Sequence, residues 1–176
     1  MILIKSNESF GLKKIKKLFN QKKFVITEDK SSRYFFELIL TFDKNIIKID
    51  TKSNSISMNL PISFELFFSE IKNLYIERFV NVGNLNYKPV KQSVSFKNNI
   101  INLNYIHNII MTNLILNLDI GIDKNDLYKF IWPNDKDIQI NKLDTHITNL
   151  KNKIKNGLKI DLNIISNAGI LKLIID

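Results

Sequence analysis

The chain of 176 residues has no cysteine, which excludes disulfide bridges, thiolate zinc sites and cysteine nucleophiles. Its most apolar stretch, residues 105–122, includes His107 and Asp119 among several asparagines and is too polar to span a membrane. The apolar start, MILI, gives way at once to Lys5 and is too short for a signal peptide. These absences predict a soluble, cytoplasmic protein without a membrane partner.

Residues suited to catalysis are also scarce. His107 lies among apolar residues and is expected at the edge of the core. His146 borders an apolar helical stripe, where packing or a phosphate contact is the expected role. No carboxylate cluster accompanies these two histidines, and the five glycines form no phosphate-binding loop. The sequence therefore predicts that the protein is not an enzyme and holds no cofactor or metal ion.

Positive charge is in excess, because 26 basic residues against 17 acidic ones give a formal net charge of +9. Such a balance favours polyanionic partners. Only two of the basic residues are arginine, and this lysine-rich mix with abundant isoleucine and asparagine is typical of an AT-rich genome. The total charge is therefore weaker evidence than its size suggests. Between residues 139 and 159, however, five lysines accompany one acidic residue, Asp144, so the local excess falls on a single segment.

That segment, QINKLDTHITNLKNKI at 139–154, has the periodicity of an amphipathic helix. One narrow stripe is apolar: Leu143, Ile147, Leu150 and Ile154. The opposite face is uncharged and hydrogen-bonding: Asn141, Thr145, Thr148, Asn149 and Asn152. Lysines flank that face, Lys142 and Lys153 on one side and Lys151 and Lys155 on the other. Amides and hydroxyls suit base edges and lysines suit phosphates, so we expect helix 140–156 to enter the major groove of DNA. An ordinary surface helix fits the same pattern.

Residues 1–79 read as a small α/β domain. Apolar or alternating runs predict strands, and longer amphipathic runs predict helices. The expected strands are 2–5, 24–27, 34–42, 46–50 and 55–59, and the expected helices are 8–22 and, after Pro61, 63–79. This domain is expected to serve dimerisation or partner binding.

Residues 80–176 change pattern. Short strands at 82–85, 93–96 and 100–103, the last two joined by a turn at 98–99, predict an antiparallel sheet. A long apolar helix at 104–118 follows, and then a short helix that Asp123 caps and Trp132-Pro133 ends. After the acidic loop 134–137 come helix 140–156, ended by Gly157, and a hairpin of strands 158–165 and 170–175. The expected fold class is α+β, with a C-terminal winged helix-turn-helix preceded by an antiparallel sheet.

With its elements in this order, the second domain resembles the DNA-binding effector domain of the OmpR/PhoB-type response regulators. The resemblance covers about residues 80–175. The segments that carry it are VGNLNY at 82–87, DLYKFIW at 126–132, LDTHITNLKNKI at 143–154 and AGI at 168–170. LDTHI is similar to the family's V-D-x-H-I signature, and LKNKI stands where the family has L-R-x-K-L.

The resemblance implies that the helix after the acidic loop reads the major groove and that the hairpin, or wing, touches the adjacent minor groove. The positions that match the family's groove-facing residues are Asp144, Thr145, Thr148, Asn149 and Asn152. Asn141 and Lys151 match positions where the family often has arginine, and Ser166 and Asn167 match the wing, where it usually has Arg-Gly. Losing these arginines removes guanine readers, so A·T-rich sites are expected, with Asn149 and Asn152 reading adenine. The loop 134–137 matches the place where the family can contact RNA polymerase.

The first domain resembles a shortened receiver domain of the same regulators, and a generic α/β module is the alternative. The phosphorylation chemistry does not carry over. Ser6-Asn7 stands where a receiver has the acidic pair that holds Mg²⁺. Asp43 is out of register for the phosphoacceptor, and Leu60 replaces the lysine before the proline. We therefore expect a degenerate receiver-like domain with no phosphorylation site.

Together these features predict a sequence-specific, phosphorylation-independent transcription regulator that binds double-stranded DNA, most simply as a homodimer. The alternatives are a protein-binding adaptor that keeps the winged-helix fold, and an architectural protein that binds DNA without sequence preference.

Overall fold

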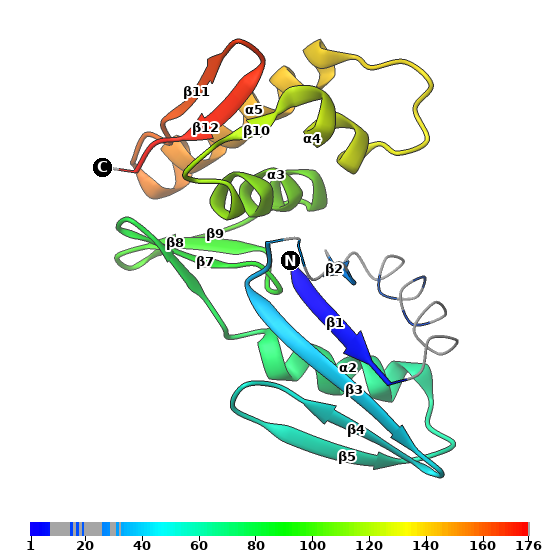
Figure 1. The fold of residues 1–176 in the computed structure, drawn as a ribbon. Helices are drawn as coiled ribbons and strands as arrows, with labels where there is room; N and C mark the ends of the chain where they lie inside the picture. The colour runs from blue at the N-terminus through cyan, green and yellow to red at the C-terminus, as the bar shows by residue number, and fades with distance from the viewer. Residues whose placement is uncertain are drawn as a thin grey trace. The chain divides into compact units, whose positions relative to one another are not determined.

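The computed structural model describes residues 1–7, 15, 17, 19, 26–28, 31 and 33–175. The chain divides into two compact units, Met1–Arg78 and Phe79–Asp176 (Figure 1). Both units mix helices and sheets, so the α+β class is confirmed.

The first unit is built on a mixed sheet. Its strands are β1 (Ile2–Ser6), β2 (Ile26–Thr27), β3 (Phe36–Asp43), β4 (Ile46–Asp50) and β5 (Ser55–Asn59), in the order β2-β1-β3-β4-β5. β1 runs parallel to β2 and β3, whereas β4 runs antiparallel to both of its neighbours. A receiver sheet is doubly wound and parallel, so this expectation is wrong for β4 and β5. The physical reason is the length of the connections: Lys44-Asn45 and the turn at 51–54 are far too short for the crossover that parallel strands need.

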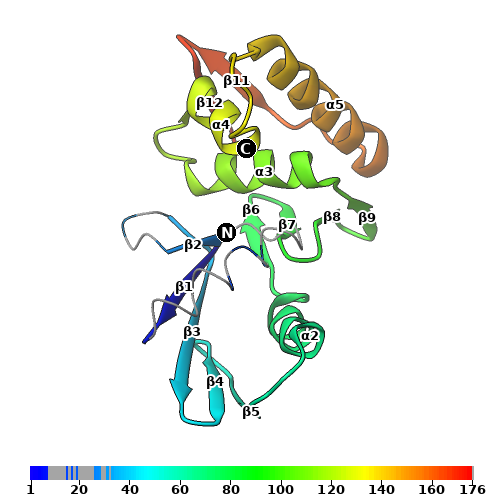
Figure 2. The ribbon, with the colours of Figure 1, turned by 90° about the vertical axis from the view of Figure 1, so that its right-hand side faces the viewer.

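Helix α2 (Phe64–Tyr75) lies against one face of this sheet (Figures 1 and 2). The side chain of Ser63 caps it by accepting a hydrogen bond from the backbone N–H of Leu66. Tyr75 is the last helical residue, not Phe79 as expected, and it anchors the end of the helix to β3. Its ring stacks on Phe36 at 5.3 Å, and its hydroxyl donates to the carbonyl of Glu37 at 2.6 Å.

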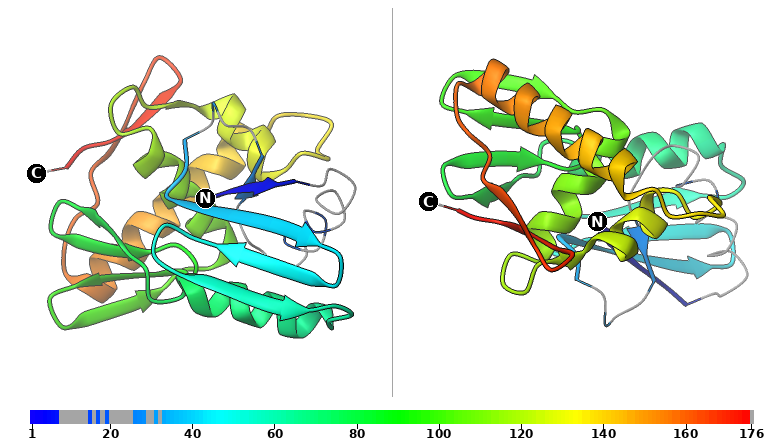
Figure 3. Two further views of the ribbon diagram at one scale, coloured as in Figure 1. Left: turned by 60° about the horizontal axis from the view of Figure 1, so that its bottom comes forward. Right: turned by 90° about the horizontal axis from the view of Figure 1, so that it is seen from above.

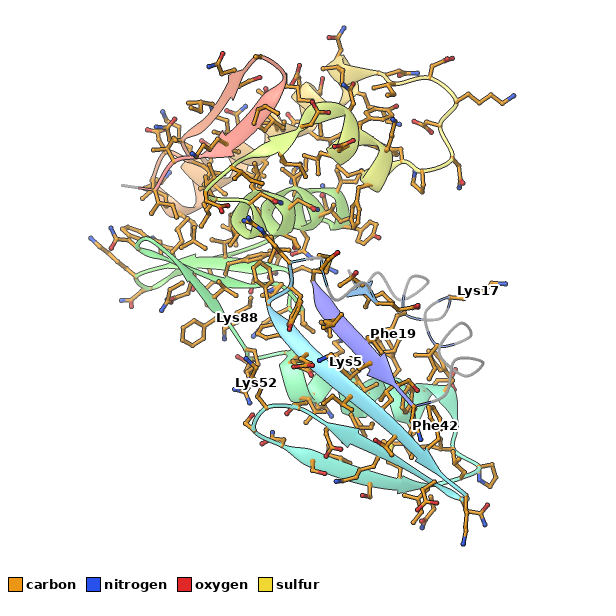
Figure 4. The ribbon with its side chains drawn as sticks, in the orientation of Figure 1. Lys5, Lys17, Phe19, Phe42, Lys52 and Lys88 are labelled. Carbon is orange, nitrogen blue, oxygen red and sulfur yellow. The ribbon has the colours of Figure 1, made fainter. Side chains whose placement is uncertain are left out.

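The expected helix at 8–22 falls mostly outside the described residues. Ile15, Lys17 and Phe19 are described, and all three are helical. Phe19 is fully buried and meets Phe68 of α2 edge to face at 5.2 Å (Figure 4). Phe19 therefore belongs to the core of the first unit.

The second unit begins with an antiparallel sheet of β6 (Val80–Val82), β7 (Leu85–Lys88), β8 (Ser93–Phe96) and β9 (Asn99–Asn102). The strand expected at 82–85 is wrong, because these residues form the tight turn between β6 and β7. Gly83 has a φ of +57° there, a conformation that favours glycine, and Val82 pairs with Leu85. The hairpin of β8 and β9 turns at Lys97-Asn98, one residue before the expected place.

Helix α3 (Tyr105–Leu116), capped by Asn104, lies between this sheet and the helix that follows it in the chain (Figures 1 and 2). Every residue from His107 to Leu116 is buried, as expected for a helix that is apolar nearly all round. Two of its polar side chains, Asn108 and Thr112, are hydrogen-bonded to the sheet and the residue that follows β7. The Tyr87 hydroxyl lies 2.7 Å from both the Asn108 side-chain oxygen and the Thr112 hydroxyl, and the Asn108 amide donates to the carbonyl of Pro89 at 3.1 Å.

The remaining elements are β10 (Ile122–Asp123), α4 (Lys124–Ile131), α5 (Ile140–Leu158), β11 (Ile164–Asn167) and β12 (Ile170–Leu173). The side chain of Asp123 caps α4, and Trp132 ends it, both as expected. The hairpin of β11 and β12 joins β10 in a three-stranded sheet of order β10-β12-β11. Three helices followed by such a hairpin make a winged helix-turn-helix. An antiparallel sheet precedes it as the sequence predicted, but it has four strands where three were expected.

Gly157 does not end α5 as expected, because the left-handed residue is Lys159, with a φ of +59°. Gly157 is instead inside the helix, where a Cβ atom would overlap the side chain of Ile101 in β9. The C-terminal part of α5 thus lies directly on the four-stranded sheet (Figure 3). No helix among the described residues is long and apolar enough to cross a membrane.

Candidate nucleic-acid interface

Helix α5 is oriented by its apolar stripe. Leu143, Leu150 and Ile154 are fully buried, and Ile147 and Leu158 nearly so. The stripe predicted from the sequence is therefore confirmed, and it extends one turn further, to Leu158. Burial of these five side chains fixes which face of the helix meets the solvent.

The opposite face of α5 is exposed and carries no charge. The side chains that the sequence placed there are all exposed: Asn141, Thr145, Thr148, Asn149 and Asn152. Thr145 donates back to the carbonyl of Asn141 at 2.8 Å, which leaves its hydroxyl oxygen available as an acceptor. Asn156, which the sequence reasoning left out, is also exposed, one turn beyond Asn152. The four-residue spacing could have found it.

Three lysines lie along the second half of α5. Lys153 and Lys155 are exposed, and Lys151 is half-buried. Lys155 pairs with Asp161 at 2.9 Å, but both side chains are largely exposed, so the pair is weak. These ammonium groups can meet phosphates on either side of the uncharged face.

The charges in the first half of α5 have partners inside the unit. The Lys142 ammonium lies 3.0 Å from a carboxylate oxygen of Asp135 and 4.1 Å from the centre of the Trp132 ring. The Tyr128 hydroxyl donates to the same Asp135 oxygen at 2.6 Å. Tyr128 and Lys142 hold the pKa of Asp135 below its usual value, and the bond to Asp135 raises the pKa of Tyr128. This cluster ties the loop after α4 to the start of α5.

Asp144 and His146 are also engaged. Asp144 accepts a hydrogen bond from the Lys124 ammonium at 2.7 Å, which links α5 to the first residue of α4. The ring of His146 lies 5.5 Å from Trp132 and 6.0 Å from His107, which is buried in α3. Sequence reasoning could not find Lys124, because nothing in the chain marks it as the partner of a residue twenty positions later.

The two histidines are disfavoured as cations. Burial lowers the pKa of His107, with the charges of His146 and Lys153 adding to the effect. Burial and nearby Lys142 lower the pKa of His146. The Nδ1 atom of His107 is buried and has no hydrogen-bond partner among the described residues. Both rings are therefore neutral packing elements near pH 7.

The wing presents polar residues at its tip. Ser166 and Asn167 end β11 and are exposed. Ala168 and Gly169 follow with φ values of +48° and +82°, the two-residue turn that suits the twist of a hairpin. Ile165 and Ile170 are exposed beside them. The wing has no arginine, so it offers amide and hydroxyl groups in place of a cation.

Within the described part of the chain, no three His, Asp or Glu side chains lie close enough together to hold a metal ion.

No protein-family model matches the chain, and no curated protein matches it. Among solved structures, 17 chains match. One is the DNA-binding domain of E. coli CadC, which is 14% identical, with a TM-score of 0.49, over 57% of this chain and 94% of that domain. The winged-helix arrangement described above follows from the elements of this chain themselves.

Proposed function

We propose that the protein is a DNA-binding transcription regulator that reads the major groove with α5. One observation carries the proposal: the exposed face of α5 is uncharged and hydrogen-bonding, and lysines border it in a winged helix-turn-helix. A surface helix that only meets water usually carries charges at the centre of its outer face. Here the amides and hydroxyls occupy the centre, where base edges would lie.

Each predicted contact has its own role in this proposal. Asn149 and Asn152 read adenine in A·T-rich sites, with Asn141, Thr145 and Thr148 beside them. Lys151, Lys153 and Lys155 bind phosphates, and Ser166 and Asn167 of the wing lie in the neighbouring minor groove. Lys142, Asp144 and His146 have partners within the unit, so we assign them a positioning role with at most a phosphate contact from Lys142.

We further propose that the first unit assembles the protein without phosphorylation. Asn7 stands near the place of a receiver's acidic pair, and its side chain bonds both the N–H and the carbonyl of Phe42, at 2.9 and 3.0 Å. An amide used in this way cannot hold Mg²⁺ as a carboxylate would. Asp43 is exposed at the end of β3, beside the turn. A homodimer in the cytoplasm, bound to repeated half-sites, remains the prediction.

The test is a titration of the full chain against a randomised duplex library at near-physiological salt, with the bound DNA sequenced. An enriched, A·T-biased, repeated motif supports a specific regulator and gives the half-site spacing. A motif dominated by G·C refutes the reading by Asn149 and Asn152. Weak binding that salt abolishes and that enriches no sequence contradicts a specific regulator and favours an architectural protein.

A second candidate is a protein-binding adaptor, and one surface favours it. Phe130 of α4 and Ile138 of the following loop are exposed apolar residues on either side of the acidic segment 134–137. The same surface is where a regulator would contact RNA polymerase. A chain that binds no duplex but captures a protein partner, with capture lost in Phe130→Ser, would establish the adaptor.

A further inference from the structure

The sheet of the first unit ends in an open edge at β5. In the strand order β2-β1-β3-β4-β5, β5 has one neighbour among the described strands. The backbone N–H of Leu60 donates to Asn45 on the β4 side. Since alternate residues of a strand point their backbone groups the same way, the N–H and carbonyl groups of Ser55, Ser57 and Asn59 point outward. These groups are a template for another strand.

This edge has none of the features that usually prevent pairing. Soluble proteins protect open edges with lysine, proline, bulges or covering helices. β5 reads Ser-Ile-Ser-Met-Asn and has no charge and no proline. Its Ser and Asn side chains are exposed, so nothing in the described unit covers them.

An apolar groove runs beside the edge. It has a volume of about 640 Å³, and β5 and the start of α2 form its walls. Five of its lining residues are apolar, Ile56, Met58, Pro61, Ile62 and Leu66, and the others are Ser57, Asn59, Ser63 and Glu70. Leu66 is 52% exposed, whereas Phe67, Phe68 and Ile71 of the same helix are buried. A strand added to β5 would place its own alternate side chains against this groove.

We propose that β5 of a second copy of the chain occupies this edge, antiparallel about a two-fold axis through Ser57, so that two sheets join into one. The strand is complementary to itself in this register. Ile56 stands opposite the partner's Met58, Ser57 opposite the partner's Ser57, and Ser55 opposite the partner's Asn59. Apolar residues meet apolar ones over the groove, and no like charges are opposed. All outward backbone groups of Ser55, Ser57 and Asn59 find partners in this register.

The inference rests only on the dimer in the proposed function and holds whether or not the chain binds DNA. A strand of another protein is the competing occupant. Self-pairing is favoured for two reasons. An uncharged strand has no charges with which to select a different protein, and the two-fold axis brings Ile56 of each copy against Met58 of the other.

Cysteine cross-linking tests the register, because the chain has no native cysteine. Residues directly opposite in a hydrogen-bonded antiparallel pair have Cα atoms about 5.5 Å apart. That distance lies within the range of about 4.4–6.8 Å that a disulfide spans. Ser57→Cys should therefore form a linked dimer under mild oxidation at micromolar concentration. Ser55→Cys alone should stay unlinked and should link when mixed with Asn59→Cys. Asn73→Cys, at an exposed position on α2, is the matched control and should stay unlinked.

Analytical ultracentrifugation of the full chain without DNA tests the dimer itself. Ser57→Pro removes an outward N–H and leaves the bonds to β4 intact, so it should raise the dimer dissociation constant at least tenfold with an unchanged circular dichroism spectrum. A native chain that is monomeric at every concentration overturns the proposal. So does a dimer in which the Ser57→Cys variant stays unlinked, or in which Asn99→Cys on β9 links instead. Since none of these experiments contains DNA, failure of the DNA-binding proposal would leave their results unchanged.

Discussion

The two halves of α5 differ in what their polar side chains contact. In the first half, Lys142, Asp144 and His146 bind groups of α4, its following loop and α3. In the second half, Thr148, Asn149 and Asn152 are exposed, and Lys153 is exposed beside them. The difference indicates a division of labour: Lys142, Asp144 and His146 hold the start of the helix in place, and the exposed side chains of the second half are available to a ligand. A sequence pattern gives both halves the same appearance.

The largest expected effect comes from removing the two amides of the second half. Asn149→Ala with Asn152→Ala should abolish the preference for the selected site over a scrambled one, at about 1–3 kcal/mol for each amide that reads a base. Competition binding measures this preference. The free energy of unfolding should stay within about 0.5 kcal/mol of that of the native chain, because both side chains are exposed. If the double variant still prefers the selected site, Asn149 and Asn152 are not the residues that read the bases.

A substitution in the first half of α5 should instead lower the stability of the fold and leave the sequence preference unchanged. Lys142→Ala loses a half-exposed ion pair and a cation over an indole ring, which together stabilise the fold by about 1 kcal/mol. Urea unfolding followed by the fluorescence of Trp132, the single tryptophan of the chain, measures this loss. Lys136→Ala, an exposed lysine of the same loop, is the control and should change little. Both variants should bind different DNA sequences in the same order of affinity as the native chain. A changed order would contradict the division of roles between Lys142 and the exposed side chains of the second half.

The flanking lysines should change affinity without changing preference. Lys151→Ala or Lys153→Ala removes one phosphate contact, so the slope of log K against log salt concentration should shrink by about 0.9 for each. Binding to all sequences should weaken by the same factor. Lys97→Ala, in the turn between β8 and β9, serves as the control. An effect confined to one sequence would identify a base contact instead.

The smallest effect concerns pH. The pKa values of His107 and His146 are lowered in the folded unit, whereas an unfolded histidine titrates near 6.5. The folded unit therefore binds fewer protons, and its stability is complete well above pH 6.5 and falls as the pH drops through that value. Unfolding followed by Trp132 fluorescence at pH 7.5 and 5.5 should show this loss, and His107→Phe should reduce it. Equal stability at both pH values would mean that neither ring is protected from protonation.

Much of the second unit could be predicted because its signals are local. The stripe from Leu143 to Ile154 needs only helical periodicity, and Asp123 marks the start of α4 by its capping chemistry. The end of α5 could not be predicted. Gly157 lies inside the helix because a larger residue there would overlap Ile101, which is more than fifty positions earlier in the chain. The strand expected at 82–85 is wrong for a similar reason: Val82 and Leu85 belong to two different strands that pair across the turn Gly83-Asn84, and the pairing is seen only in the folded unit.

The direction of β4 and β5 could have been predicted, although their side-chain pattern would look the same in a parallel sheet. The short connections before both strands are visible in the sequence and permit only antiparallel pairing. In the site, the exposed face of α5 follows from periodicity, but the partners of Lys142 and Asp144 lie on other elements, and only the folded unit brings them together.

The buried hydroxyl of Tyr87 has a consequence for how the second unit is assembled. A core rich in isoleucine and leucine can pack in several alignments of similar energy, because these side chains are nearly interchangeable. The bonds from Tyr87 to Asn108 and Thr112, and from Asn108 to Pro89, can form in one alignment only. Any sliding or rotation of α3 on the sheet would leave several polar atoms unpaired in the interior. These hydrogen bonds therefore fix the alignment of α3 on the sheet, and with it the orientation of the helices that pack on α3.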